Sequence, residues 1–268
     1  MDSDLYVYVA APDDPRWSQV AGMTRALEGE LVAGHVPPPE LDMLASGALS
    51  PKCQVFLASK GDQAVGMLAA VALGDREAEL MGLYVKPELR GRYIGQQLVA
   101  VGESFLFHSR LFVITADERN NVSGTAGVLD RHEFKSLGNG RWRRDELAKI
   151  GKFLAEYHER CLSFGGGNWA VMVYNDDVTT TDAVIAALKA VFDLGEQAAH
   201  EVMYVTHYGG SAPAWRYSTE KEAQQMAARL RLEFRNAGYG TQVAVSPVAA
   251  LDSPVLLPAS WPTDSPPD

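Results

Sequence analysis

The segment Leu83–Leu98 reads LYVKPELRGRYIGQQL and predicts a strand, a loop and a helix in succession. The strand ends near Val85, because Pro87 has no backbone N–H to donate to a β-ladder. Apolar residues then recur at helical spacing over Ile94–Ser109. The first N–H groups of a helix have no intrahelical partner, and the helix dipole favours an anion beside them. The junction therefore predicts an anion site at the start of this helix.

The composition of the loop suits a phosphate group. Gly91 and Gly95 let a ligand approach the main chain closely, and Arg90 and Arg92 add positive charge. An ordinary strand-to-helix turn would also explain the glycines, so the surrounding elements have to decide between the two interpretations.

Those surrounding elements predict an α/β domain. Strands are expected at Leu5–Val9, Val55–Ser59, Ala64–Leu73, Ala78–Val85 and Leu111–Ala116. Helices are expected at Arg16–Ala33, Ile94–Ser109 and Ser123–His132. The two strands on either side of KGDQ read as an antiparallel hairpin.

This order of elements, with RGxxIGxxL at the loop, resembles the GNAT family of N-acetyltransferases over roughly Leu5 to Arg144. The resemblance implies a mixed, mainly antiparallel sheet with helices on both faces, and acetyl-CoA as the cofactor. It implies that Glu79 is the catalytic carboxylate, which requires burial to raise the pKa of its side chain. The residues that it assigns to the cofactor, mostly through backbone amides, are Leu83, Tyr84, Val85, Arg90, Gly91, Arg92, Tyr93, Ile94, Gly95, Gln96 and Asn121.

The chain departs from the pattern of that family at two places. Tyr93 stands where the loop usually has its second glycine, and we expect it to fit if its backbone dihedrals are helical. Asp130 stands where a tyrosine usually protonates the leaving thiolate, and His132 is a possible substitute. The alternatives are an acid from elsewhere, water, or a slow or inactive transferase.

The second half of the chain predicts a smaller α+β domain. Strands are expected at Trp169–Tyr174, Trp215–Tyr217 and Gln242–Ser246, and helices at Thr181–Phe192, Glu196–His207 and Thr219–Ala237. The predicted domains are 1–145 and 168–248, with a helical, glycine-rich linker over 146–167 and a Pro- and Ser-rich disordered tail over 249–268.

Asn175, Asp176 and Asp177 follow the buried strand directly, just where a helix should begin. Residues of these types are good turn and helix-capping residues, which is one interpretation. In the segment VMYVTH, however, Met203 and His207 lie four residues apart and share a helix face. Acids and an imidazole above apolar side chains would suit an ammonium group attached to a bulky apolar side chain.

YNDDVTTTDAV, VMYVTH and YSTEKEA, in that order, resemble ClpS, the adaptor that hands N-degron substrates to the ClpA or ClpC unfoldase. The resemblance implies three helices on a three-stranded antiparallel sheet. It implies that Asn175, Asp176 and His207 hold the α-amino group of a substrate with a bulky apolar N-terminal residue, and that Asp177 steadies the loop. It further assigns Thr179, Thr181, Val184 and Met203 to the side-chain pocket and Glu220 to the unfoldase contact.

Bulk properties restrict the partners and the location. The net charge of −10 argues against non-specific binding of nucleic acid or anionic membranes. No apolar run approaches the roughly 20 residues of a membrane span. Cys53 and Cys161 are far apart in the sequence, without metal-ligand spacing, and read as reduced thiols of a cytoplasmic protein that holds no metal.

We therefore expect a bifunctional protein, an acetyl-CoA-dependent N-acetyltransferase domain coupled to an N-degron recognition domain. One alternative is a non-catalytic Clp protease adaptor in which the first domain is inactive or senses CoA. Another is a transferase for a small amine, with the second domain as a targeting device.

Overall fold

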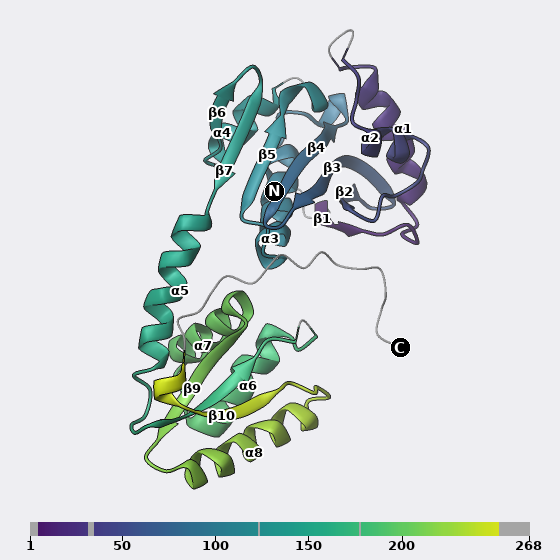
Figure 1. Cartoon of the computed structure of the whole chain (residues 1–268). Helices are drawn as coiled ribbons and strands as arrows, with labels where there is room; N and C mark the ends of the chain where they lie inside the picture. The colour runs from purple at the N-terminus through teal and green to yellow at the C-terminus, as the bar shows by residue number, and fades with distance from the viewer. Residues whose placement is uncertain (1–4, 32–34, 123, 177, 252–268) are drawn as a thin grey trace. The chain divides into compact units, whose positions relative to one another are not determined.

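The computed structural model describes residues 5–31, 35–122, 124–176 and 178–251 (Figure 1). The chain divides into two compact units, with the boundary between Glu146 and Leu147. Within the described ranges, no helix combines the length and the apolar character needed to cross a lipid bilayer.

The first unit is built on a mixed sheet with the strand order β1-β2-β3-β4-β5-β7-β6. Its strands are β1 (Leu5–Ala10), β2 (Cys53–Lys60), β3 (Gln63–Gly74), β4 (Glu77–Val85), β5 (Val113–Asp117), β6 (Lys135–Gly138) and β7 (Arg141–Asp145). Neighbouring strands pair antiparallel, apart from β4 and β5, which run parallel. The predicted mixed, mainly antiparallel sheet is confirmed.

Helices cover both faces of this sheet, each over its own apolar core. Trp17, Val20 and Leu27 of α1 (Trp17–Glu28) and Leu41 and Leu44 of α2 (Pro39–Ala45) pack against one face. Apolar residues of α3 (Ile94–His108) and α4 (Thr125–Arg131) pack against the other. Sequence analysis predicted neither α2 nor the β6–β7 hairpin.

A bulge in β4 separates it from β5. The parallel register runs from the pair Glu77–Val113 to the pair Leu80–Ala116 and then ends. Gly82 follows with a φ of 65°, in the left-handed region that favours glycine. An extra residue of this kind bends a strand and interrupts its ladder. Beyond the bulge, β4 runs on towards the predicted anion loop.

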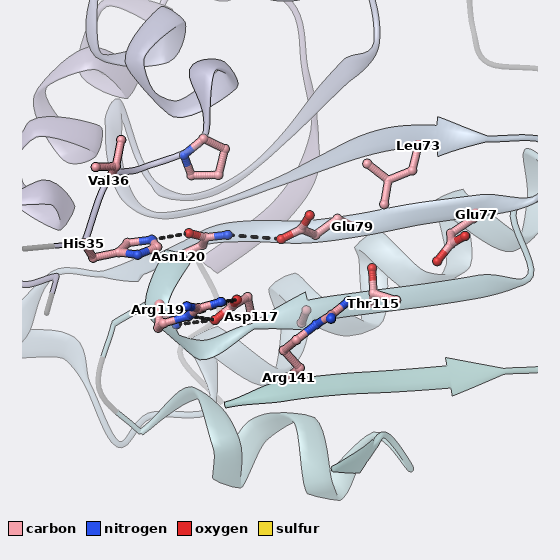
Figure 2. A pocket seen from close by; sticks show the side chains of 12 residues that line it. His35, Val36, Leu73, Glu77, Glu79, Thr115, Asp117, Arg119, Asn120 and Arg141 are labelled. Carbon is pink, nitrogen blue, oxygen red and sulfur yellow. Dashed lines mark hydrogen bonds and ion pairs between the residues drawn. The ribbon is translucent and has the colours of Figure 1, made fainter. Parts of the chain in front are cut away.

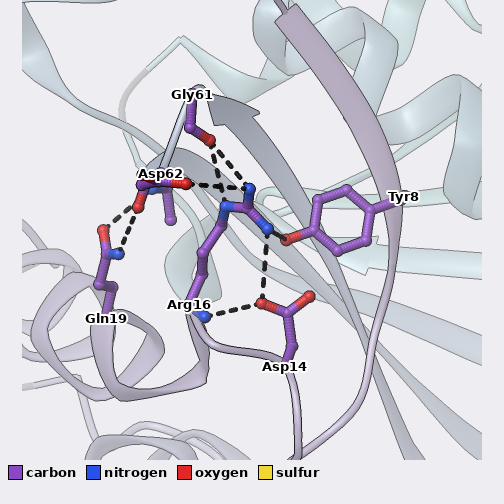
Figure 3. A network of polar contacts seen from close by, with 7 residues as sticks. Tyr8, Asp14, Arg16, Gln19, Gly61 and Asp62 are labelled. Atoms are coloured by element: carbon purple, nitrogen blue, oxygen red, sulfur yellow. Dashed lines mark hydrogen bonds and ion pairs between the residues drawn. The ribbon is translucent and has the colours of Figure 1, made fainter.

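Arg16, ahead of α1, ties that helix to the β2–β3 turn (Figure 3). Its guanidinium donates two hydrogen bonds to the carbonyl oxygen of Gly61, at 3.2 and 3.0 Å, and one to the hydroxyl of Tyr8 at 3.4 Å. Its backbone N–H donates to Asp14 at 2.7 Å. These contacts fix the position of α1 against the edge of the sheet.

The second unit has the predicted three-stranded antiparallel sheet, with the order β10-β8-β9. Its strands are β8 (Trp169–Tyr174), β9 (Ser211–Tyr217) and β10 (Val243–Pro247), and its helices are α5 (Leu147–Cys161), α6 (Thr181–Phe192), α7 (Glu196–Gly209) and α8 (Glu220–Asn236). Thr219 and Glu222 form a capping box that starts α8, with each side chain bonded to the backbone of the other residue.

Helix α5 occupies most of the segment expected to be a linker, and it packs within the second unit. The ring of Phe153 meets that of Tyr204 of α7 edge to face, with centroids 5.7 Å apart. Arg160 lies 3.3 Å from the buried carboxylate of Glu201. Cys161 is fully buried, and burial raises the pKa of its thiol to about 12, so the thiol is unreactive at neutral pH.

The three glycines at 165–167 lie against β9 instead of forming a loose spacer. A Cβ on Gly165 would come within 2.5 Å of the carbonyl oxygen of Arg216, and one on Gly167 would overlap the backbone of Tyr217. The guanidinium of Arg216 donates to the carbonyl oxygens of Leu162 and Gly167, at 2.6 and 2.8 Å. Glycine is needed here because two backbones touch.

Candidate functional site

The loop between β4 and α3 is braced by the side chain of Arg90. Its Nε donates to the carbonyl oxygen of Val85 at 2.9 Å, and its terminal nitrogen contacts both carboxylate oxygens of Glu30, at 2.7 and 2.8 Å. Gly91 has a φ of 78°, and a Cβ there would meet nothing within 4 Å. The loop is therefore held in place while its outer side stays open.

Tyr93 does not have the helical dihedrals that we expected. Its φ is 65° and its ψ is 6°, so it takes up the left-handed conformation that a glycine would adopt at this position. The side chain is 67% exposed and so is not buried in the loop. The tyrosine is therefore accommodated at a cost in backbone strain, on the order of 1–2 kcal/mol.

A cavity of about 220 Å³ lies between this loop and α4. Of the residues expected at a cofactor, those that line it are Leu83, Val85, Arg90, Gly91, Ile94 and Gly95. Tyr84, Arg92, Tyr93, Gln96 and Asn121 are not among its lining residues. A Cβ on Gly95 would point at Val128, 3.8 Å away, so the bare glycine keeps the cavity open.

Asn121 joins the end of β5 to the bulge in β4. Its Oδ1 accepts the backbone N–H of Leu83 at 2.8 Å, and its Nδ2 donates to the carbonyl oxygen of Asp117 at 2.6 Å. The carbonyl oxygen of Leu83 accepts the N–H of Val122 at 3.2 Å. We expected the Leu83 amide to face a ligand carbonyl, but an amide side chain already satisfies this buried donor.

A second cavity, of about 350 Å³, contains Glu79 (Figure 2). Oε1 of Glu79 accepts Nδ2 of Asn120 at 3.1 Å, and Oδ1 of Asn120 lies 2.6 Å from Nε2 of His35. Burial raises the pKa of Glu79, and the hydrogen bond from Asn120 offsets part of that rise. A carboxylate whose pKa is raised accepts a proton more readily than an ordinary carboxylate does.

His35 and Asn120 are site residues that sequence analysis missed. His35 lies in the connection between α1 and α2, and Asn120 ends the short 3-10 helix Glu118–Asn120 after β5. Neither belongs to a spacing pattern that could have singled it out, because the two meet Glu79 only through the fold.

The residues considered as proton donors to a leaving thiolate do not line either cavity. Asp130 is exposed on α4. Nδ1 of His132 lies 2.6 Å from Oε2 of the buried Glu103, whose other oxygen accepts Arg144 at 2.8 Å. His132 thus belongs to a network that ties α3 to β7.

In the second unit, Asp176 closes the turn after β8. Its Oδ1 accepts the N–H groups of Val178 and Thr179, at 3.2 and 2.8 Å, and its Oδ2 accepts the hydroxyl of Thr179 at 2.7 Å. Burial alone would raise the pKa of Asp176, but the hydrogen bonds from Thr179 and Val178 together lower it. Asp176 therefore steadies the turn, and Asp177, for which we expected that role, lies outside the described residues.

The ends of β8 and α7 meet at this turn. The N–H of Asn175 donates to the carbonyl oxygen of Gly210 at 2.8 Å, three residues after His207. The imidazole of His207 lies edge-on to the ring of Tyr208, with centroids 4.7 Å apart. The structure thus brings the backbone of Asn175 next to the C-terminal end of α7, the helix that carries His207.

The expected side-chain pocket is partly apolar. Val184 of α6 and Met203 of α7 are buried. The hydroxyl of Thr179 lies 2.6 Å from that of the buried Thr241, so the turn is also tied to the segment before β10. Thr181 is half-buried at the start of α6. Glu220, assigned to an unfoldase contact, is exposed at the start of α8.

Both parts of the chain match known families. Residues 20–134 match the acetyltransferase (GNAT) family, and residues 166–244 match the ATP-dependent Clp protease adaptor protein ClpS. Among the described residues, no group of three or more His, Cys, Asp or Glu side chains is placed to hold a metal ion.

Solved structures resemble each part. ClpS2 of Agrobacterium tumefaciens, solved with L-phenylalaninamide, is 30% identical, with 30% of this chain and 96% of that chain covered and a TM-score of 0.29. A GNAT acetyltransferase of Staphylococcus aureus is 12% identical, with 53% and 98% covered and a TM-score of 0.43. The PaiA N-acetyltransferase of Thermoplasma acidophilum, solved with coenzyme A, is 15% identical, with 52% and 96% covered and a TM-score of 0.39.

Proposed function

We propose that this chain is a bifunctional cytoplasmic protein, because residues 20–134 match the GNAT family and residues 166–244 match the ClpS family. The first unit transfers an acetyl group from acetyl-CoA to an amine. The second binds the free N-terminus of proteins destined for the Clp protease. The observation that carries the first proposal is the pair of cavities beside β4, one lined by Glu79 and the other by the loop glycines.

In the proposed reaction, acetyl-CoA supplies an activated acetyl group from the cavity at Gly91 and Gly95. Glu79 takes a proton from the acceptor ammonium, and Asn120 and His35 hold the carboxylate in position. The amine nitrogen attacks the thioester carbonyl, the C–N bond forms, and the C–S bond breaks. Water gives the thiolate its proton, since neither Asp130 nor His132 lines the two cavities.

The variant Gly95→Trp tests the cofactor cavity. Its indole would fill the space in front of Val128, so we expect acetyl-CoA to bind at least about 100-fold more weakly, which corresponds to about 2.8 kcal/mol. Isothermal titration calorimetry measures this. The control is Gly127→Trp on α4, where a Cβ faces open space. Unchanged affinity in a folded Gly95→Trp protein would place the cofactor elsewhere.

For the second unit, we propose that Asn175, Asp176 and His207 receive the α-amino group of a substrate N-terminus. Asp176 also shapes the turn, through its hydrogen bonds to Val178 and Thr179. The apolar side chain of the substrate would lie against Val184 and Met203, which are buried. Glu220 would contact a ClpA- or ClpC-type unfoldase.

The variant Asp176→Ala tests the turn. It removes three accepted hydrogen bonds, each worth on the order of 1–3 kcal/mol when the acceptor is charged, so the loop should lose its conformation. We expect a Phe-initiated peptide to bind at least about tenfold more weakly in fluorescence anisotropy, a loss of about 1.4 kcal/mol. Asp182→Ala, at an exposed acid of α6, is the control. Peptide affinity equal in both variants would contradict the assignment.

A second candidate function is a non-catalytic adaptor whose first unit is inactive or senses CoA. The observation that favours it is the engagement of the Leu83 amide by Asn121, which removes one donor that could polarise a thioester. Acetyl-CoA binding without release of free thiol in the presence of any amine would select this function.

A further inference from the structure

The Glu79 cavity holds a cation without a partner. Among the residues that the structure describes, the guanidinium of Arg141 makes no hydrogen bond and no ion pair, although it lines this cavity (Figure 2). The nearby arginines differ. Arg119 donates to both oxygens of Asp117, and Arg143 donates to Asp145 at 3.0 Å. Arg141 therefore remains able to bind an anion.

The sheet register places Arg141 and Glu79 on the same face. Glu79 lies opposite Thr115 of β5, and Arg141 lies opposite Asp117, two residues further along the same strand. Residues two apart in a strand share a face. The carboxyl group of Glu79 and the guanidinium of Arg141 therefore lie on the same face of the sheet, on either side of β5, and line one cavity. The charge of Arg141 also acts on Glu79 and opposes the rise in its pKa that burial causes.

Two apolar side chains complete the rim of the cavity. Val36 is 81% exposed and Leu73 is 54% exposed, and both line it. Large apolar side chains in contact with water beside a cavity suit an apolar group of a ligand. At about 350 Å³, the cavity lies near the lower end of the range of about 300–1,000 Å³ for small-molecule sites.

We propose that the acetyl acceptor is a free α-amino acid with an apolar side chain. Its carboxylate pairs with Arg141, its amine meets Glu79, and its side chain contacts Val36 and Leu73. Guanidinium groups hold carboxylates through two parallel hydrogen bonds. A protein N-terminus has an amide in place of that carboxylate and would leave Arg141 unpaired. This inference rests on the proposed acetyltransferase function.

The transfer balances in atoms and charge. The ammonium of the amino acid loses one proton to Glu79 and a second to water on forming the amide. The acetyl carbon exchanges its bond to sulfur for a bond to nitrogen, and the leaving thiolate takes up one proton from water, so that one proton remains on Glu79. The product keeps its carboxylate and has lost its positive charge. It therefore keeps the attraction to Arg141 but no longer offers an ammonium group to Glu79.

The test compares leucine with leucinamide, which lacks the carboxylate. Thiol release from acetyl-CoA should give a kcat/KM for leucine at least about tenfold above that for leucinamide. Arg141→Gln should raise the KM for leucine at least about tenfold and change the KM for leucinamide much less, and Arg141→Lys should restore part of the difference. Arg143→Gln, whose arginine already pairs with Asp145, is the matched control. Calorimetric titration of leucine alone should show the same dependence on Arg141.

Equal use of leucine and leucinamide, or a leucine KM unchanged in Arg141→Gln, would overturn the inference. A peptide N-terminus preferred over leucine would do the same. Failure to bind acetyl-CoA or to release thiol with any amine would count against the proposed transferase function instead. In that case, if leucine binds the parent protein but not Arg141→Gln, the amino-acid site is still supported. If leucine does not bind the parent protein, the amino-acid site is contradicted.

Discussion

Gly167→Ala is expected to lower the free energy of unfolding of the second unit by about 3–5 kcal/mol. The φ of Gly167 is 111°, a conformation that residues with a side chain rarely adopt. An added Cβ would lie closer than 3.0 Å to the carbonyl group of Tyr217, and these are backbone atoms of β9 that cannot turn aside as a side chain would. The segment would have to leave β9, and its hydrogen bond to Arg216 would be lost.

The neighbouring glycine provides the matched control. Gly166 has open space around the position of a Cβ, and it is not among the residues with positive φ. Gly166→Ala should therefore change stability by less than about 0.5 kcal/mol. Urea unfolding followed by the fluorescence of Trp169 and Trp215 measures both variants. Equal midpoints for the two would show that the segment is not held against β9.

Glu79→Gln is expected to lower kcat by about 10²–10⁴-fold in the proposed transferase, because glutamine cannot accept the proton of the amine. Glu77→Gln is the control. Glu77 lines the same cavity, and its carboxylate pairs with Arg143 at 3.9 Å. A kcat for Glu79→Gln that equals that of Glu77→Gln would show that Glu79 is not the base.

The pH dependence of kcat/KM provides a second test of Glu79 as the base. Burial raises the pKa of Glu79, so the basic form is present only above that raised value, and kcat/KM should fall as pH drops through it. Glu79→Gln should lose this limb of the profile. A carboxyl with a raised pKa in the folded state also destabilises the fold as pH rises through that value. The variant should therefore be at least as stable as the parent protein at neutral pH, which separates a lost base from a damaged fold.

Local sequence signals were sufficient for the elements that carry them. The glycines and proline of the β4–α3 junction, and the polar run after β8, mark real ends of strands. The β6–β7 hairpin was missed because Lys135–Gly138 is exposed along its whole length and shows no apolar alternation. Helix α2 was missed because a run of prolines usually interrupts a helix, whereas Pro39 occupies the first helical turn, where no N–H is needed.

The candidate sites were harder to predict, since their contacts are made by residues far apart in the chain. The spacing of His35, Glu79 and Asn120 carries no signal. The parallel pairing of β4 and β5 and the connection between α1 and α2 bring the three residues together. The resemblance to ClpS assigned different roles to Asp176 and Asp177, although both residues are aspartates. The direction of the Asp176 side chain towards Thr179 depends on the turn, which a residue count does not give.

The packing of α5 determines where a fragment that contains only the second unit has to begin. The match to the ClpS family begins at residue 166, but a fragment that starts there would expose Tyr204 and leave the carboxylate of Glu201 without Arg160. Such a fragment would also lack the hydrogen bond that the guanidinium of Arg216 donates to the carbonyl oxygen of Leu162. We therefore expect that a fragment of the second unit has to start at Leu147 to fold, and that shorter fragments aggregate on expression.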